Sequence, residues 1–299
     1  MSTSNTAGGA RPADAGRAPS ARSAGASGSR ESADAPLLRL RGVGKNFGPV
    51  QALTNIDLDI PAGQVTALVG DNGAGKSTLI KTISGIWQPD RGELQWMGRP
   101  VHLDTPRAAT ELGIATVYQD LALCDNLDIV QNMFLGRELM SNWQLDEVNM
   151  ELGAKSTLAD LSVVSVRSIR QPVGSLSGGQ RQAVAVARAV MQNAKLVIMD
   201  EPTAALGVTQ TRVVLDLITQ LASRGIAVLV ISHNLNDVNA VADRLAILHL
   251  GRLAATGPLS EFDNQLIVEL MTTGRSSRNG AGGAPASGQA ASAPAPSTR

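Results

Sequence analysis

The sequence is poor in aromatic residues and contains a single cysteine. Aromatic residues make up only 2% of its 299 residues, although 43% are apolar, so the core is expected to consist mainly of Ala, Val, Leu and Ile. Cys124 has no partner for an internal disulfide and cannot form a structural zinc site alone, which predicts an inert thiol in a reducing cytoplasm. His102 and His249 lie in apolar, strand-like surroundings without metal-ligand spacing, and both are predicted to be structural.

The chain also lacks net charge and long apolar runs. Its 26 basic and 26 acidic side chains balance, so bulk electrostatics predict no nucleic-acid or anionic-membrane partner. No apolar run approaches the roughly 20 residues that a membrane helix needs, and no apolar stretch follows the N-terminal charges as it would in a secretory signal. We expect that, if the protein serves a membrane process, other chains supply the membrane part.

Composition divides the chain into two tails and a folded block. Residues 1–36 and 274–299 are rich in Ala, Gly, Ser and Pro and are predicted to be disordered, because they cannot bury enough apolar surface to offset their ordering entropy. Residues 37–273 form the predicted domain. Apolar runs within it predict buried strands at Gln64–Val69, Ile114–Tyr118, Leu196–Met199, Ala227–Ile231 and Leu245–Leu250.

Helical patterns alternate with these strands, which predicts an α/β fold with a mainly parallel sheet covered on both faces. Thr105 is expected to cap a helix that starts at Pro106 and ends at Gly113, and Ser177 a helix that runs to about Gln192. The more polar stretch from about 122 to 175 predicts an inserted helical subdomain, with helices at Asp128–Glu138 and Leu145–Leu161.

A glycine-rich loop follows the first of these strands and is the strongest local signal. It fits the pattern Gly-x-x-x-x-Gly-Lys-Ser/Thr with a strand before it and a helix behind it, which is the context that a phosphate-binding loop requires. Its glycines allow backbone N–H groups to surround phosphate oxygens, Lys76 adds a positive charge for the β- and γ-phosphates, and the Ser77 hydroxyl is a ligand for Mg²⁺. The predicted nucleotide-binding residues here are Gly70, Asn72, Gly73, Ala74, Gly75, Lys76, Ser77 and Thr78.

Two carboxylates end another buried strand. Asp200 stands where the strand Leu196–Met199 emerges, and it is predicted to hold Mg²⁺. Glu201 comes next, and because side chains alternate along a strand it points elsewhere, toward the attacking water, as a general base. Such a pair is a weak signal alone, but together with the phosphate-binding loop it predicts ATP hydrolysis.

The segment Leu176-Ser177-Gly178-Gly179-Gln180 resembles the signature of the ABC-transporter ATPases, which other P-loop ATPases lack. The resemblance covers essentially the whole block from 37 to about 273 and implies a P-loop NTPase core with a mainly parallel sheet, an antiparallel β subdomain and an inserted helical subdomain. Other family marks follow in order: Phe47 for stacking on adenine, Gln119 for sensing Mg²⁺ and His233 for contacting the γ-phosphate. Singly, these three residues would also fit core packing, a polar loop and a helix cap.

The resemblance implies that one chain holds only half of each ATP site. In the family, Ser177, Gly178, Gly179 and Gln180 face the γ-phosphate that the opposite subunit holds, so a second copy or a related domain is required, most simply in a homodimer. Catalytic roles then fall to Glu201, His233, Gln119 and Lys76, and the Mg²⁺ ligands are Ser77, Gln119 and Asp200. This sequence departs from the family at Gly207, where an acid usually helps the two sites communicate.

Two further segments are similar to the monosaccharide importer branch of the family, residues 117–123 and residues 132–138. That similarity implies a subunit on the cytoplasmic face of the membrane, bound to permease subunits that receive sugar from an extracytoplasmic binding protein. Three alternatives remain: an importer ATPase for amino acids, metals or lipids, a soluble ABC ATPase of DNA repair or ribosomes, and a non-catalytic subunit suggested only by Gly207.

Overall fold

The computed structural model describes residues 36–161, 167–204 and 206–276. A six-stranded sheet forms the centre of the fold, with the strand order β12-β11-β3-β10-β9-β6. Its members are β3 (Val65–Gly70), β6 (Ile114–Val117), β9 (Leu196–Asp200), β10 (Ala227–Ile231), β11 (Arg244–His249) and β12 (Arg252–Pro258). All neighbours are parallel except β12, which runs antiparallel to β11 at the edge. The predicted α/β fold with a mainly parallel sheet is confirmed.

Both faces of this sheet are buried, because successive side chains of a strand point to opposite sides. In β9, Leu196 and Ile198 belong to the core on the side of the antiparallel strands, whereas Val197 and Met199 belong to the core on the opposite side. The sheet therefore lies between two apolar layers, and its loops carry the polar residues that follow β9 and β10.

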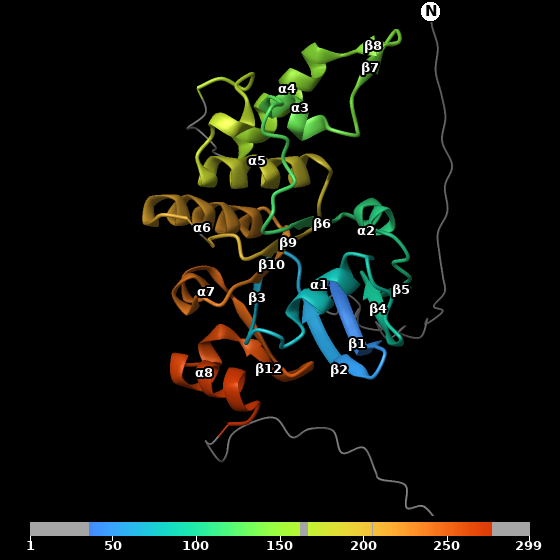
Figure 1. Ribbon diagram of the computed structural model, residues 1–299, viewed down its shortest axis with the longest axis vertical. Coiled ribbons are helices and arrows are strands. Elements are labelled where there is room, and N and C mark those ends of the chain that lie inside the picture. Colours follow the sequence, from blue (N-terminus) through green and yellow to red (C-terminus); the bar gives the residue numbers. More distant parts are fainter. Residues whose placement is uncertain (1–35, 162–166, 205, 277–299) are drawn as a thin grey trace, which may run out of the picture. The chain divides into compact units, whose positions relative to one another are not determined.

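A second sheet is antiparallel, with the order β2-β1-β4-β5. It consists of β1 (Leu38–Phe47), β2 (Val50–Ile60), β4 (Arg91–Trp96) and β5 (Arg99–Val101). Helix α1 (Lys76–Ile83) contacts both β2 and β3, so it lies between the two sheets, and its buried Leu79, Ile80 and Ile83 join their cores (Figure 1). This sheet is the antiparallel β subdomain that the family resemblance implied.

The other helices of the α/β core are α2 (Pro106–Leu112), α5 (Gly178–Met191), α6 (Val208–Ser223), α7 (Leu235–Val241) and α8 (Asn264–Thr273). Helix α6 packs on β10 and β3, and α8 packs on β11 and β12, so both cover the face opposite α1 (Figure 1). The two predicted caps are confirmed. The Thr105 hydroxyl accepts a hydrogen bond from the N–H of Ala108, Gly113 ends α2 in the left-handed conformation, and Ser177 caps α5.

The stretch predicted to be mainly helical contains α3 (Ile129–Phe134), a short hairpin of β7 (Met140–Ser141) and β8 (Gln144–Leu145), α4 (Glu147–Asp160) and the 3₁₀ turn η1 (Val173–Ser175). A second 3₁₀ turn, η2 (Leu259–Glu261), precedes α8. The prediction of one helix over Asp128–Glu138 was wrong. Asp128 is the N-cap, and the helix ends at Phe134 because Leu135 takes an extended ψ of 120° and Gly136 a φ of 76°. The second predicted helix starts later than expected because Leu145 pairs in the hairpin.

Further predictions concern the two tails, membrane-spanning helices and two histidines. The tails predicted to be disordered lie outside the described residues, apart from Pro36 and residues 274–276. Among the helices of the described ranges, none combines the length and apolar character needed to cross a bilayer. His249 ends β11, and its Nδ1 lies 2.8 Å from the carbonyl oxygen of Met271, which fits a structural role. His102 was expected in a strand, but it follows β5 and is exposed.

Candidate functional site

A cavity of about 580 Å³ opens at the carboxyl ends of β3 and β9, where loops from both sheets meet. Its lining brings together most of the residues predicted from the phosphate-binding loop and from the ends of the strands. They are Asn72, Gly73, Gly75, Lys76, Ser77 and Thr78, together with Gln119, Asp200 and Glu201. The described residues thus place three separate segments of the sequence around one space.

The floor of this cavity is the turn between β3 and α1. Gly75 is the N-cap of α1 with a φ of 106°, and a Cβ at this position would lie 2.7 Å from the carbonyl oxygen of Ala52. A side chain is therefore excluded here on both conformational and steric grounds. The first backbone N–H groups of a helix have no carbonyl one turn earlier to bond, so those of Lys76, Ser77 and Thr78, which line the cavity, can donate to an anion there.

Lys76 extends back across its own loop. Its Nζ donates hydrogen bonds to the carbonyl oxygens of Gly70, at 2.6 Å, and Asp71, at 3.0 Å. Burial lowers the pKa of Lys76 from its ordinary value, and the negative charges of Glu201, Asp71 and Asp200 oppose that lowering. Burial therefore favours the neutral form of the Lys76 amino group, and the surrounding carboxylates favour its charged form, as negative phosphate oxygens in the cavity would.

Asp200 and Glu201 end β9 beside this lysine. Burial raises the pKa of the Asp200 carboxyl above its usual range, and the neighbouring charge of Glu201 raises it further, while Lys76 and Lys81 act in the opposite direction. A carboxyl group with such a raised pKa, in a cavity beside a lysine, is typical of a functional site. Glu201 has a φ of 50°, in the left-handed region that a residue other than glycine rarely adopts.

His233 reaches Glu201 from the neighbouring strand. Because β9 and β10 are parallel neighbours with Asp200 opposite Ile231, the residues after both strands emerge side by side. The His233 Nδ1 lies 2.8 Å from Oε2 of Glu201, although His233 itself does not line the cavity. Its side chain remains 72% exposed, so its Nε2 edge is available to a ligand or to another chain.

The remaining predicted residues of this group lie at the edge of the site. Gln119 is exposed two residues after β6 and lines the cavity. Phe47 ends β1 and packs edge-on against Trp87 with ring centroids 5.3 Å apart, while the Lys45 ammonium lies 5.7 Å from its ring centre. Phe47 is 39% exposed and does not line the cavity, and neither Gly70 nor Ala74 does. Gly70 ends β3 and Ala74 lies in the loop before α1, and the carbonyl oxygen of Gly70 accepts the hydrogen bond from Lys76.

The segment from Leu176 to Gln180 does not contribute to this cavity within the described chain. Ser177 and Gln180 form a reciprocal capping box at the start of α5, since the Ser177 N–H donates to the Gln180 side chain and its hydroxyl accepts from the Gln180 N–H. A Cβ on Gly178 would lie 2.6 Å from the Leu206 side chain, so the glycine permits close approach of the loop before α6. Ser177 is exposed, which leaves this helix start open toward solvent.

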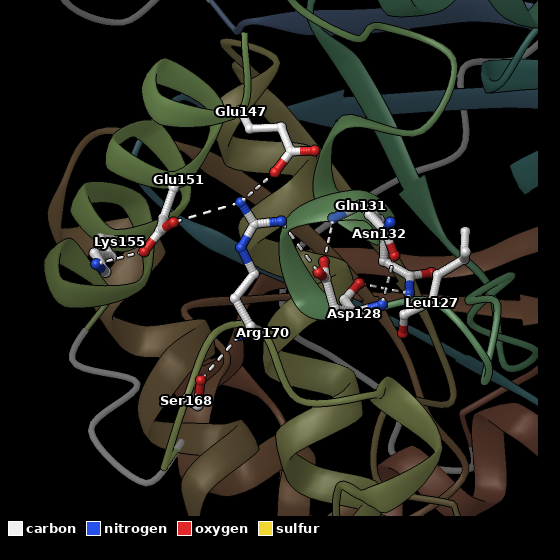
Figure 2. A network of polar contacts seen from close by, with 9 residues as sticks. All are labelled: Leu127, Asp128, Gln131, Asn132, Glu147, Glu151, Lys155, Ser168 and Arg170. Atoms are coloured by element: carbon white, nitrogen blue, oxygen red, sulfur yellow. Dashed lines mark hydrogen bonds and ion pairs between the residues drawn. The ribbon is translucent and has the colours of Figure 1, made fainter. Parts of the chain in front are cut away.

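A network of polar contacts joins the residues before this segment to α3 and α4 (Figure 2). The Arg170 guanidinium lies between the carboxylates of Asp128, Glu147 and Glu151, at distances of 3.3, 3.0 and 3.4 Å. Nearby, buried Asn132 donates to the carbonyl oxygens of Cys124, Leu127 and Asp128 and accepts from the N–H of Cys124.

Backbone contacts complete this connection. The N–H of Val173 donates to the carbonyl of Leu127, and that of Gly174 to the carbonyl of Asp125. The segment that follows Gln119 is therefore joined to the segment that leads into Ser177.

Five lining residues were missed by sequence reasoning: Val50, Gln51, Ala52, Leu250 and Gly251. They belong to the start of β2 and to the turn between β11 and β12. One hydrogen bond ties this turn to the phosphate-binding loop, and another ties it to β2. The Gly251 N–H donates to Ala74, and the Thr54 N–H donates to Gly251. The pair Leu250-Gly251 at the end of an apolar run was the available signal for a turn, but nothing in the sequence placed that turn beside the loop.

The fold and this cavity define a nucleotide-binding P-loop protein, because an anion-binding helix start, a central lysine and paired carboxylates surround one space. The family model described as ABC transporter matches residues 53–204. That match and the similarities to curated proteins show that the chain belongs to the ABC transporter family, as an ATP-binding subunit that is an ATPase.

Two curated relatives are similar over most of their length. The chain is 49% identical over 227 residues to the fructose import ATP-binding protein FrcA of Rhizobium meliloti, covering 74% of this chain and 87% of the relative. It is 47% identical over 237 residues to the xylose/arabinose import ATP-binding protein XylG of Sulfolobus acidocaldarius, covering 79% and 94%. The ribose import ATP-binding protein RbsA 2 of Rubrobacter xylanophilus is 40% identical, but the chain spans only 46% of its length.

Solved structures agree with this assignment. A nucleotide-free ATP-binding cassette from an ABC transporter is 26% identical with a TM-score of 0.66, over 78% of this chain and 98% of that chain. The dimeric post-hydrolysis state of the cassette MJ0796 bound to ADP and phosphate is 26% identical with a TM-score of 0.62, over 74% and 98%.

Proposed function

We propose that this chain energises a monosaccharide importer by binding and hydrolysing ATP between two copies of itself. The observation that carries the ATP-binding half of this proposal is the single cavity that collects Lys76, Ser77, Gln119, Asp200 and Glu201. The fructose and xylose/arabinose importers to which the similar chains belong support the sugar half.

The phosphates would occupy the floor of the cavity. The N–H groups at the start of α1 and the Lys76 ammonium would bind the β- and γ-phosphate oxygens, with Lys76 exchanging its bonds to Gly70 and Asp71 for bonds to phosphate. Val50 and Leu250, exposed apolar residues that line the cavity, offer a surface for the nucleoside, and Phe47 would stack on the base from the end of β1.

Oxygen donors along the same wall suit Mg²⁺. Ser77 supplies a hydroxyl, Asp200 a carboxylate and Gln119 an amide oxygen, and no cluster of three or more His, Cys, Asp or Glu competes for a metal in the described ranges. Mg²⁺ takes such hard ligands and completes its shell with water and phosphate. When bound, it would neutralise charge on the phosphate oxygens, and the raised pKa of Asp200 would fall in its presence.

Glu201 is the residue that we assign to water activation. Its carboxylate lines the cavity beside Asp200, and the contact to His233 fixes one of its oxygens. The free oxygen would accept a proton from the attacking water, while His233 would contact the γ-phosphate through its exposed edge.

The start of α5 gives the reason for a second subunit. Ser177, Gly178, Gly179 and Gln180 are proposed to contact nucleotide, yet they do not line the cavity of their own chain. A head-to-tail dimer would place the start of α5 of one copy over the cavity of the other. The dimeric arrangement of the MJ0796 cassette supports this arrangement. The permease subunits would bind beside Gln119 at the cytoplasmic face of the membrane, and an extracytoplasmic sugar-binding protein would deliver the substrate.

Two experiments test the two halves of the proposal. Glu201→Gln should bind MgATP like the wild type and lose turnover by about 10²- to 10⁴-fold, because a general base contributes that much. Wild-type turnover in this variant would remove Glu201 from the catalytic role. Purification of the subunit from detergent-solubilised membranes of its host should then recover a polytopic permease with a sugar-binding protein. Recovery of ribosomes or DNA-repair proteins instead would refute the importer assignment.

A further inference from the structure

The backbone of Glu201 needs support from outside β9. Its φ of 50° is strained for a residue with a side chain, and such strain persists only where the surroundings fix it. Two backbone hydrogen bonds contribute: the Glu201 N–H donates to the carbonyl of Ile231 at 2.9 Å, and the Glu201 carbonyl accepts from the Ala204 N–H at 3.1 Å. Neither bond fixes the position of His233, which follows Ile231 by two residues.

A side-chain hydrogen bond joins the two segments directly. The Thr203 hydroxyl donates to Oδ2 of Asp237 at 2.6 Å. Thr203 lies two residues after Glu201, and Asp237 lies four residues after His233, in the first turn of α7. Asp237 is one of few buried carboxylates in the described chain, with 8% of its surface exposed. A short bond to a buried charged acceptor is stronger and more directional than one at the surface.

We propose that Thr203 and Asp237 are positioning residues for hydrolysis. Their hydrogen bond fixes the segment after β9, which contains Glu201, against the segment after β10, which contains His233, and so keeps the 2.8 Å contact between the Glu201 and His233 side chains. This inference rests on the proposed catalytic roles of Glu201 and His233. Neither Thr203 nor Asp237 lines the cavity, so the bond between them acts on the geometry of the reacting groups and leaves the phosphate-binding residues unchanged.

The test separates turnover from binding. Thr203→Val keeps the shape of the side chain and removes the hydroxyl, whereas Thr203→Ser keeps the donor and Asp237→Asn keeps an acceptor oxygen. The matched control is Thr219→Val on α6, which removes a hydroxyl that bonds only to the backbone of its own helix. For each full-length variant, kcat for ATP hydrolysis, the Kd for MgATP and the Tm would be measured.

Thr203→Val should lower kcat about tenfold or more, because a small misplacement of reacting groups has a large effect on rate. Its Kd for MgATP should stay within about twofold of the wild type, the pattern of a contact that acts only in the transition state. Thr203→Ser, Asp237→Asn and Thr219→Val should keep kcat near the wild-type value. Thr203→Val combined with Asp237→Ala should be no slower than the slower of its two single variants, since both remove the same bond.

Two results would overturn the inference. One is a wild-type kcat in Thr203→Val, and the other is an equal loss of kcat and MgATP affinity together with a lower Tm, which would show a structural role alone. The Glu201→Gln variant, measured in parallel, keeps this inference distinct from the proposed function. If Glu201→Gln retains turnover, the catalytic assignment itself fails. If it loses turnover and Thr203→Val does not, only the positioning role fails.

Discussion

Gly207 is the position at which a substitution should stabilise the protein most clearly. It is the N-cap of α6, a helix of 16 residues, and the structure gives that cap no side-chain hydrogen bond. Its φ of −72° and ψ of 160° suit any L-residue, and an added Cβ would meet no atom within 4 Å. Gly207→Asp therefore introduces a capping side chain without strain.

Two contributions add in the same direction. Capping by Asp exceeds that by Gly by a few tenths of a kcal/mol, a difference between whole substitutions that already includes the lower entropy of the unfolded chain. The charge at the positive end of the helix adds about 0.3–1 kcal/mol at low salt. A net stabilisation of about 0.5–1.5 kcal/mol corresponds to a rise in Tm of roughly 1–6 °C for a domain of this size.

The assay is thermal unfolding of the nucleotide-free full-length protein. Gly207→Ala provides no cap and should not raise the Tm, because Ala is a poorer N-cap than Gly. Gly207→Asn adds a cap without charge, so the Tm values should rise in the order Gly, Asn, Asp, with the excess of Asp over Asn lost at high salt. A Gly207→Asp protein with an unchanged or lower Tm would refute this reasoning. The same variant tests communication between sites, because unchanged ATPase cooperativity would show that the position is unimportant for it.

Two other predictions concern charges near the site. Asp200→Asn should raise the Tm of the nucleotide-free protein. The pKa of Asp200 is higher in the folded state than its ordinary value of 3.8, so the wild-type protein loses stability as the pH rises from 3.8 through the folded-state pKa. The difference in Tm between variant and wild type should therefore grow over that window and stay constant above it, and a difference that shrinks with pH would contradict the sign. Arg170→Met should lower the Tm slightly, because it removes three ion pairs that are each weak at the surface, and the loss should vanish in 1 M salt. Arg107→Met, which breaks one exposed pair on α2, is the matched control and should have a smaller effect. Equal effects would show that the Arg170 network adds nothing.

The elements that sequence predicted well are those with strong local signals. β10 was predicted to the residue, since five apolar residues in a row are buried on both faces. The caps at Thr105 and Ser177 were predicted because their hydroxyl groups precede helical patterns. By contrast, the hairpin of β7 and β8 was missed. Its turn residues Asn142 and Trp143 adopt a positive φ, but neither is a glycine that would have indicated a turn in the sequence.

Part of the cavity lining was predictable from sequence motifs, whereas its geometry was not. The phosphate-binding loop and the carboxylates at the end of β9 followed from motifs, because local backbone requirements fix their spacing. The contact between Glu201 and His233 required the knowledge that β9 and β10 are neighbours, and the bond between Thr203 and Asp237 required the packing of α7. Val50 and Leu250 were missed for the same reason, since their role depends on a strand start and a turn that meet only in the folded chain.

The central claim is that each ATP site is built from the cavity of one copy and the start of α5 of another, and a mixing experiment tests it most directly. Lys76→Ala removes the cation of the cavity, and Ser177→Arg blocks the start of α5, so each protein alone should lack ATPase activity while keeping a cooperative unfolding transition. An equimolar mixture should regain activity, because a mixed dimer combines the intact cavity of one copy with the intact helix start of the other. A mixture that stays as inactive as its two components would contradict the shared site.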